Sequence, residues 1–368
     1  MRKNLLLALL SFLFAFLILE GAVRILNLEE PRPMQAGPKK DWALVPDRIW
    51  IEHHPRLGWY HQKNKDAIHT HQSYEVRIRT NQDGFRSMRE YAEEKPAGVT
   101  RILALGDSFT FGFGVEDAEN FPAVLEAAHP DLEAINLGVA GYGVDQILMA
   151  YREIGAHYHP DYVVISIFPE DFWRSLRAFA DTGHAKPYFV LNPKGQPELR
   201  NVPVPQPFTL RTNQFPEVIQ YGPVERLLMQ SAAWRLTQRG LTRLGKNFRW
   251  IDPDTTAEWI LGKALLKTLI EEIRASGSQP VLVLIAPERW MAGDRKESVH
   301  KSVIRLVQSE KVDFIDLAPD FREAVGKGKV SDFYIPEDGH WTVKGHQLVA
   351  SILEKYLKEQ GVELAAAA

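Results

Sequence analysis

Four short polar segments contain residue types that could together carry out nucleophilic catalysis. Residues 106–108 read Gly-Asp-Ser, and residues 136–143 form a glycine-rich stretch that could direct backbone N–H groups at a negatively charged oxygen. Residues 169–171 read Pro-Glu-Asp, and residues 337–340 read Glu-Asp-Gly-His. A serine, a loop of backbone donors, and a histidine close to a carboxylate are the components of an acyl-transfer site.

The elements that must position these segments are predicted by apolar runs of strand length that alternate with helical periodicity. Such alternation indicates an α/β fold, in which a parallel sheet is covered by helices on both faces and ligands bind at the carboxyl ends of the strands. The predicted strands are 101–105, 132–136, 162–167, 280–285 and 312–316, and the predicted helices are 117–128, 144–157, 256–276, 295–309 and 343–359.

The segments also resemble the conserved blocks of the SGNH or GDSL hydrolases. Residues 106–108 match the block that holds the family's nucleophile, and the spacing of residues 136–141 resembles the second block. Asp338 and His340, with residues 345–346, resemble the last block. The resemblance covers roughly residues 100–170 and 278–359. It implies a three-layer α/β/α architecture with a five-strand parallel sheet, the flavodoxin-like SGNH fold, and the N-terminal region resembles a membrane-attached bacterial branch.

The resemblance also implies a role for each candidate residue. Ser108 would attack an acyl carbon, His340 would take and later return the proton, and Asp338 would orient the imidazole. The backbone N–H groups of Ser108 and Gly141 would bind the oxyanion. Taken singly, these residues have simpler explanations as a helix cap, a loop histidine and a turn glycine, so it is their combination that favours an enzyme.

Two features depart from the family's pattern. The third block normally supplies an asparagine that donates to the oxyanion, whereas the matching position here is Glu170. An ionised carboxylate would repel the oxyanion, so Glu170 is expected to be protonated, turned away, or part of an unusual mechanism. The family's carboxylate often lies three residues before the histidine, where this chain has Glu337. We favour Asp338 as the orienting carboxylate and keep Glu337 as the alternative.

Three tryptophans and two histidine pairs are further candidates for binding a substrate or a metal. Trp173, Trp290 and Trp341 each follow a strand end and could contact substrate, although buried packing is the commoner role of tryptophan. Paired histidines, at 69 and 71 and at 157 and 159, have no carboxylate at a useful spacing. We therefore expect no metal and no cofactor.

The N-terminal part differs in character from the rest of the chain. Arg2 and Lys3 precede an apolar run that continues to Leu19, and no small-x-small cleavage site follows. Residues 1–26 are therefore predicted to be an uncleaved signal anchor that spans a membrane and leaves the remainder outside the cytoplasm, in the periplasm or at the cell exterior. Residues 27–95 are predicted to form a tether and a small β region, and residues 96–368 the hydrolase-like domain, whose proline-rich stretch at about 172–255 is read as an insertion without regular elements.

Composition narrows the possible functions. The 368 residues carry 44 basic and 47 acidic side chains, a net charge of −3, which does not favour nucleic-acid binding. Cysteine is absent, which excludes a cysteine nucleophile and a disulfide scaffold. The leading hypothesis is an extracytoplasmic serine esterase or O-acyltransferase acting on acyl esters, foremost acetyl esters, of a carbohydrate or envelope polymer. The alternative is a catalytically impaired member that binds a glycan or a partner during polymer assembly.

Overall fold

A five-stranded parallel sheet forms the centre of the protein. The computed structural model describes residues 2–26, 50–178, 180, 184–204, 231, 233, 257–291 and 297–366. The sheet order is β11-β10-β7-β5-β6, and every neighbouring pair is parallel, which confirms the predicted five-strand sheet. The strands are β5 (Thr100–Gly106), β6 (Leu132–Gly138), β7 (Tyr162–Ile167), β10 (Gln279–Leu284) and β11 (Asp313–Asp316).

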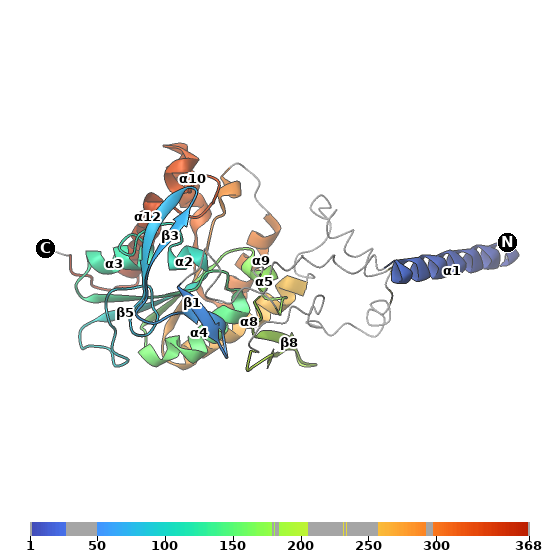
Figure 1. Ribbon diagram of the computed structural model, residues 1–368, viewed down its shortest axis with the longest axis horizontal. Helices are drawn as coiled ribbons and strands as arrows, with labels where there is room; N and C mark the ends of the chain where they lie inside the picture. The colour runs from blue at the N-terminus through green and yellow to red at the C-terminus, as the bar shows by residue number, and fades with distance from the viewer. Residues whose placement is uncertain are drawn as a thin grey trace.

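Helices cover the sheet on both faces. On one side α3 (Phe121–Ala128) packs against α12 (Val343–Glu359), and on the other α4 (Val144–Glu153) packs against α8 (Ala257–Ala275), as Figure 1 shows. The remaining helices of this domain are α2 (Ser108–Phe111), α5 (Asp171–Arg174), α9 (Glu297–Glu310), α10 (Leu317–Gly326) and α11 (Val330–Phe333), with 3-10 turns at Gly155–Tyr158 and Glu288–Trp290.

Most of the predicted elements match the observed ones, and the differences have local causes. Helix α3 begins at Phe121 because the side chain of Asn120 accepts a hydrogen bond from the N–H of Ala123 and caps the helix there. Helix α4 ends at Glu153, and a 3-10 turn occupies the last part of the predicted helix.

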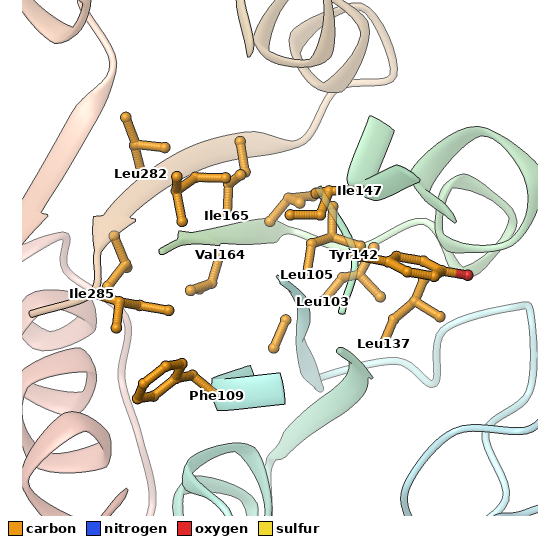
Figure 2. Close-up of a cluster of buried hydrophobic side chains, with 14 of the residues drawn as sticks. Leu103, Leu105, Phe109, Leu137, Tyr142, Ile147, Val164, Ile165, Leu282 and Ile285 are labelled. Carbon is orange, nitrogen blue, oxygen red and sulfur yellow. The ribbon is translucent and has the colours of Figure 1, made fainter. Parts of the chain in front are cut away.

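The core lies where the sheet meets its helices. Figure 2 shows apolar side chains of β5, β6, β7 and β10 meeting those of α2 and α4. Leu103, Leu105 and Ile165 are completely buried. Strand β6 is buried along its whole length, as expected for a strand covered on both faces.

The order of the strands determines where a site can form. From β5 the chain moves to β6 on one side and then returns to β7 on the other side of β5. This reversal is a topological switch point, and ligands of open α/β sheets bind at the carboxyl ends of the strands beside such a point. The segment that contains Ser108 follows β5 directly.

A small β region accompanies the sheet. Strands β1 (Ile51–His54) and β2 (Gly58–His61) form one antiparallel hairpin, and β3 (Asp66–His71) and β4 (Tyr74–Arg79) form another. The predicted tether, at residues 27–49, lies outside the described residues.

The proline-rich insertion is more regular than predicted. Besides α5, it contains an antiparallel hairpin of β8 (Tyr188–Leu191) and β9 (Pro197–Arg200). The prolines are compatible with this hairpin because Pro187 precedes β8 and Pro197 is the first residue of β9. The rest of the insertion, apart from a few positions, falls outside the part of the chain that the structure describes.

The N-terminal segment forms helix α1 (Arg2–Ile25). Among the described residues, no helix is both long and apolar enough to cross a membrane. The structure therefore does not support the spanning helix that we predicted over residues 1–26.

Candidate active site

The turn after β5 fixes Ser108 at the start of α2. The side chain of Asp107 accepts a hydrogen bond from the N–H of Phe109 at 3.0 Å and caps the helix. A side chain at Gly106 would come within 2.2 Å of the Thr110 Oγ1 atom, so only glycine permits this close turn. The Ser108 residue is 7% exposed and is among the residues that line a cavity of about 380 Å³.

His340 and Asp338 reach Ser108 from the segment before α12. The Nε2 atom of His340 lies 2.7 Å from the Oγ atom of Ser108, and its Nδ1 atom lies 2.5 Å from Oδ1 of Asp338. The N–H of His340 also donates to Asp338 Oδ1 at 3.0 Å. The structure thus brings together three residues that are up to 232 positions apart in the sequence, in the order serine, histidine and carboxylate that the sequence predicts.

The carboxylate beside the histidine is Asp338. Burial by itself would raise the pKa of Asp338, but the hydrogen bond and charge of His340 outweigh it and hold the pKa below its ordinary value. Asp338 is therefore ready to stabilise an imidazolium cation. Glu337 points elsewhere, because its carboxylate accepts a hydrogen bond from Gln72 at 2.9 Å.

Two backbone N–H groups are available to bind an oxyanion. Gly141 adopts a left-handed conformation with φ of +83° and lines the same cavity as Ser108. Within the described chain, the N–H groups of Ser108 and Gly141 have no hydrogen-bond acceptor. Two unpaired backbone N–H groups beside one cavity are what an oxyanion-binding loop requires.

The small β region holds this loop in place. The indole N–H of Trp59 donates to the carbonyl oxygen of Ala140 at 3.1 Å, and the hydroxyl of Tyr142 donates to the carbonyl oxygen of Trp59 at 2.5 Å. These two bonds flank Gly141, and all three of their residues are buried. Strand β2 therefore determines the position of the oxyanion-binding loop.

Glu170, at the family's asparagine position, forms an ion pair with Arg289. The two side chains are 36% and 41% exposed. Arg289 lines the cavity, whereas Glu170 is not among its lining residues. The Glu170 carboxylate is therefore engaged by Arg289 and is outside the cavity lining.

A buried cluster of charges lies beside Ser108. The Nη1 atom of Arg174 donates to Asp171 Oδ1 at 2.6 Å and to Asp107 Oδ2 at 2.8 Å. Burial and the charge of Asp107 raise the pKa of Asp171 well above its ordinary value. Burial disfavours the charge on Arg174, but the two carboxylates outweigh this effect and raise the pKa of the guanidinium.

Aromatic side chains complete the cavity. Phe109, Phe113 and Phe168 line it together with the catalytic candidates. The ring centroids of Phe109 and Phe113 lie 4.8 and 5.0 Å from that of His340. The imidazole of His340 therefore packs against two apolar rings, which restrict its orientation.

The three tryptophans do not line this cavity. Trp290 and Trp341 are each 1% exposed and belong to the core, so the structure does not place them where they would contact a substrate in this cavity. The ring of Trp341 packs against Phe109 and Phe321 at 4.9 and 5.5 Å. Trp173 is 42% exposed, but it carries the guanidinium of Arg177 on its ring and lies outside the cavity lining.

Sequence reasoning missed the two arginines of the cavity. Arg174 lies one helical turn after Glu170, so its spacing in a helix that follows β7 was an available signal. Arg289 lies in the 3-10 turn Glu288–Trp290, which follows strand β10. Its position after a strand end was therefore also an available signal. Neither residue belongs to the blocks that carry the family resemblance.

Several solved structures are similar to this chain at low sequence identity. A catalytic mutant of an acetylxylan esterase from Geobacillus stearothermophilus aligns with a TM-score of 0.41 and 15% identity, over 75% of this chain and 100% of that one. The esterase EstA from Pseudoalteromonas sp. aligns with a TM-score of 0.41 and 14% identity, over 71% and 98%. A lipase/acylhydrolase from Enterococcus faecalis aligns with a TM-score of 0.40 and 15% identity, over 73% and 100%.

Sequence comparison identifies the family. No curated protein is significantly similar to this chain. The model of the GDSL-like lipase/acylhydrolase family, however, matches residues 104–348, which is more than half of the sequence and includes Ser108, Asp338 and His340. The chain belongs to the GDSL-like lipase/acylhydrolase family.

Proposed function

We propose that the protein is a serine esterase that cleaves acyl esters through an acyl-enzyme on Ser108. The observation that carries this proposal is the continuous contact from Ser108 Oγ to His340 Nε2, at 2.7 Å, and from His340 Nδ1 to Asp338 Oδ1, at 2.5 Å. An unassisted serine is a poor nucleophile at neutral pH, and a histidine at this distance can accept its proton.

The reaction follows from this geometry in two stages. Ser108 Oγ forms a bond to the acyl carbon while its proton passes to His340, and the carbonyl oxygen becomes an oxyanion beside the N–H groups of Ser108 and Gly141. The ester C–O bond then breaks, and His340 returns the proton to the leaving alcohol. Water repeats the sequence on the acyl-enzyme and releases the acid.

We propose a short acyl group, foremost acetyl, on a carbohydrate or an envelope polymer as the substrate. A cavity of about 380 Å³ is lined in part by Phe109, Phe113 and Phe168, which form an apolar wall suited to the methyl of an acetyl group. A sugar hydroxyl in place of water as the acceptor would make the same acyl-enzyme an O-acyltransferase. Product analysis with and without an added sugar acceptor distinguishes the two reactions.

A serine-directed fluorophosphonate tests the catalytic assignment. The probe should label the wild-type protein on Ser108, should not label Ser108→Ala, and should label His340→Ala far more slowly because the proton acceptor is missing. Equal labelling of the wild type and His340→Ala would exclude His340 as the base.

A second candidate function rests on Glu170. Because this position lacks the family's asparagine, the cleft could serve to hold a glycan or a partner with little or no turnover. A folded wild-type protein that binds acetylated oligosaccharide but neither hydrolyses it nor reacts with the probe would favour this function over the esterase.

We also propose that the N-terminal segment exports the protein and keeps it at a membrane. Helix α1 exposes Phe14, Leu17 and Ile18, which are 67%, 58% and 57% exposed, and Arg2 and Lys3 precede this apolar stretch. A reporter fused after residue 368 should be active only outside the cytoplasm, and the full-length chain should sediment with membranes. A soluble mature form that begins near Val23 would instead indicate a cleaved signal.

A further inference from the structure

We propose that Arg174 is a catalytic residue that supplies the side-chain oxyanion donor for which the family uses asparagine. This inference rests on the proposed esterase function and extends it to a residue outside the family's blocks. Glu170, which occupies the asparagine position, is paired with Arg289 and does not line the cavity. Arg174 does line it, together with Ser108, Gly141 and His340.

The position of the guanidinium carries the proposal. Arg174 Nη1 lies 2.8 Å from Oδ2 of Asp107, the residue before Ser108, and 3.2 Å from the carbonyl oxygen of Tyr142, the residue after Gly141. The cation therefore lies between the two segments whose backbone N–H groups would bind the oxyanion. A third donor is needed in this region of the site.

The guanidinium also has hydrogen-bonding capacity to spare. All of its contacts with Asp107, Asp171 and Tyr142 are made by Nη1. The Nε and Nη2 atoms carry three further N–H groups, and none of these has an acceptor among the described residues. The Arg174 side chain is 23% exposed, so part of it is open to an incoming substrate.

Two buried carboxylates hold this cation in place. Asp107 and Asp171 are completely buried, and each binds the same nitrogen. As the substrate carbonyl becomes an oxyanion and then a carbonyl again, Arg174 keeps its proton and only strengthens and weakens a hydrogen bond.

Arg289 is a weaker candidate for the same role. It lines the cavity, but its side chain is 41% exposed, whereas that of Arg174 is 23% exposed. Because exposure to water weakens an electrostatic interaction, a donor at this position would stabilise the oxyanion less than the partly buried Arg174.

Substitution of Arg174 by lysine tests whether Arg174 donates to the oxyanion or only supports the local structure. The three N–H groups of lysine can satisfy Asp107, Asp171 and Tyr142, so Arg174→Lys should fold, but none would remain for the substrate. With p-nitrophenyl acetate and the full-length chain, we expect kcat to fall about 100-fold while KM changes less than about threefold, as for the loss of one oxyanion donor. Arg177→Lys is the matched control, since Arg177 is outside the cavity lining, and it should retain wild-type kcat.

Chemical rescue provides a second readout, of the guanidinium group itself. Methylguanidinium added to Arg174→Ala should restore kcat at least about tenfold, whereas it should not restore His340→Ala. A wild-type kcat in Arg174→Lys would overturn the inference and leave the esterase function intact, provided that Ser108→Ala is inactive. A wild-type protein that neither hydrolyses the ester nor reacts with the fluorophosphonate would overturn both.

Discussion

Asp338 and Glu337 are neighbours of the same chemical type, yet only one of them touches His340. Glu337 adopts a left-handed backbone conformation with φ of +64°, and its carboxylate accepts a hydrogen bond from Gln72. Asp338 binds both the ring and the backbone N–H of His340. At the scale of single residues, the direction of the side chain therefore decides which of the two carboxylates can orient His340.

This difference leads to a paired prediction. Asp338→Asn should lower kcat by about 10³- to 10⁴-fold, because an amide cannot stabilise the imidazolium and favours the wrong histidine tautomer. Glu337→Gln, which keeps an acceptor for Gln72, should change kcat less than about twofold. Steady-state hydrolysis of a small acyl ester measures both, and a larger loss in Glu337→Gln would transfer the orienting role to Glu337.

At the scale of elements, the sheet positions Ser108, and the small β region contacts the loop that contains Gly141. Strand β5 ends at the switch point of the sheet, which places Ser108 at its carboxyl edge. Strand β2 reaches the loop through the hydrogen bonds of Trp59 with Ala140 and Tyr142. The region before the sheet is therefore part of the site's support.

Trp59→Phe should reveal this support. Phenylalanine keeps an aromatic ring beside Tyr142, where the rings of the wild type are 5.4 Å apart, but it loses the hydrogen bond to Ala140. A bond of this kind contributes about 1 kcal/mol, so we expect kcat to fall roughly fivefold with little change in KM. Trp50→Phe is the control, because the buried Trp50 Nε1 atom has no acceptor in the described chain. Equal losses in the two variants would contradict a specific role for Trp59.

At the scale of the whole molecule, buried histidines link stability to pH. Burial lowers the pKa of His346 to about 3 and that of His61 to about 4. Below the ordinary value of 6.5 the unfolded chain binds protons that the folded chain does not. The stabilisation is therefore complete above about pH 6.5 and is lost progressively as the pH falls toward 4 and 3.

His346→Asn should make the fall in stability toward acid pH less steep. Asparagine can still accept the hydrogen bond that His346 receives from the N–H of Phe121, at 3.3 Å, but it does not titrate. The slope of the unfolding free energy between pH 6 and 4 should decrease by about 1.4 kcal/mol per pH unit, the contribution of one proton. Denaturant unfolding at several pH values measures the slope. His157→Asn, at an exposed position, should leave it unchanged, and an unchanged slope in His346→Asn would contradict the prediction.

The sequence by itself determined the strands, their parallel arrangement and the segments that hold Ser108, Gly141, Asp338 and His340. These features depend on local sequence patterns. A strand that is buried on both faces needs a continuous apolar run, and a tight turn needs a glycine at one position. Regular elements within the proline-rich insertion were not predicted, because a proline at or before the start of a strand leaves no periodic signal.

Only the tertiary structure decided how side chains meet across the site. It paired Glu170 with Arg289, which is 119 positions away, brought Arg174 beside Asp107, and buried Trp290 and Trp341 in the core. Pairings of this kind depend on which faces of separate elements pack together, and a linear pattern does not specify them. Residue types can therefore indicate a reaction, whereas the groups that stabilise its charge are determined by packing.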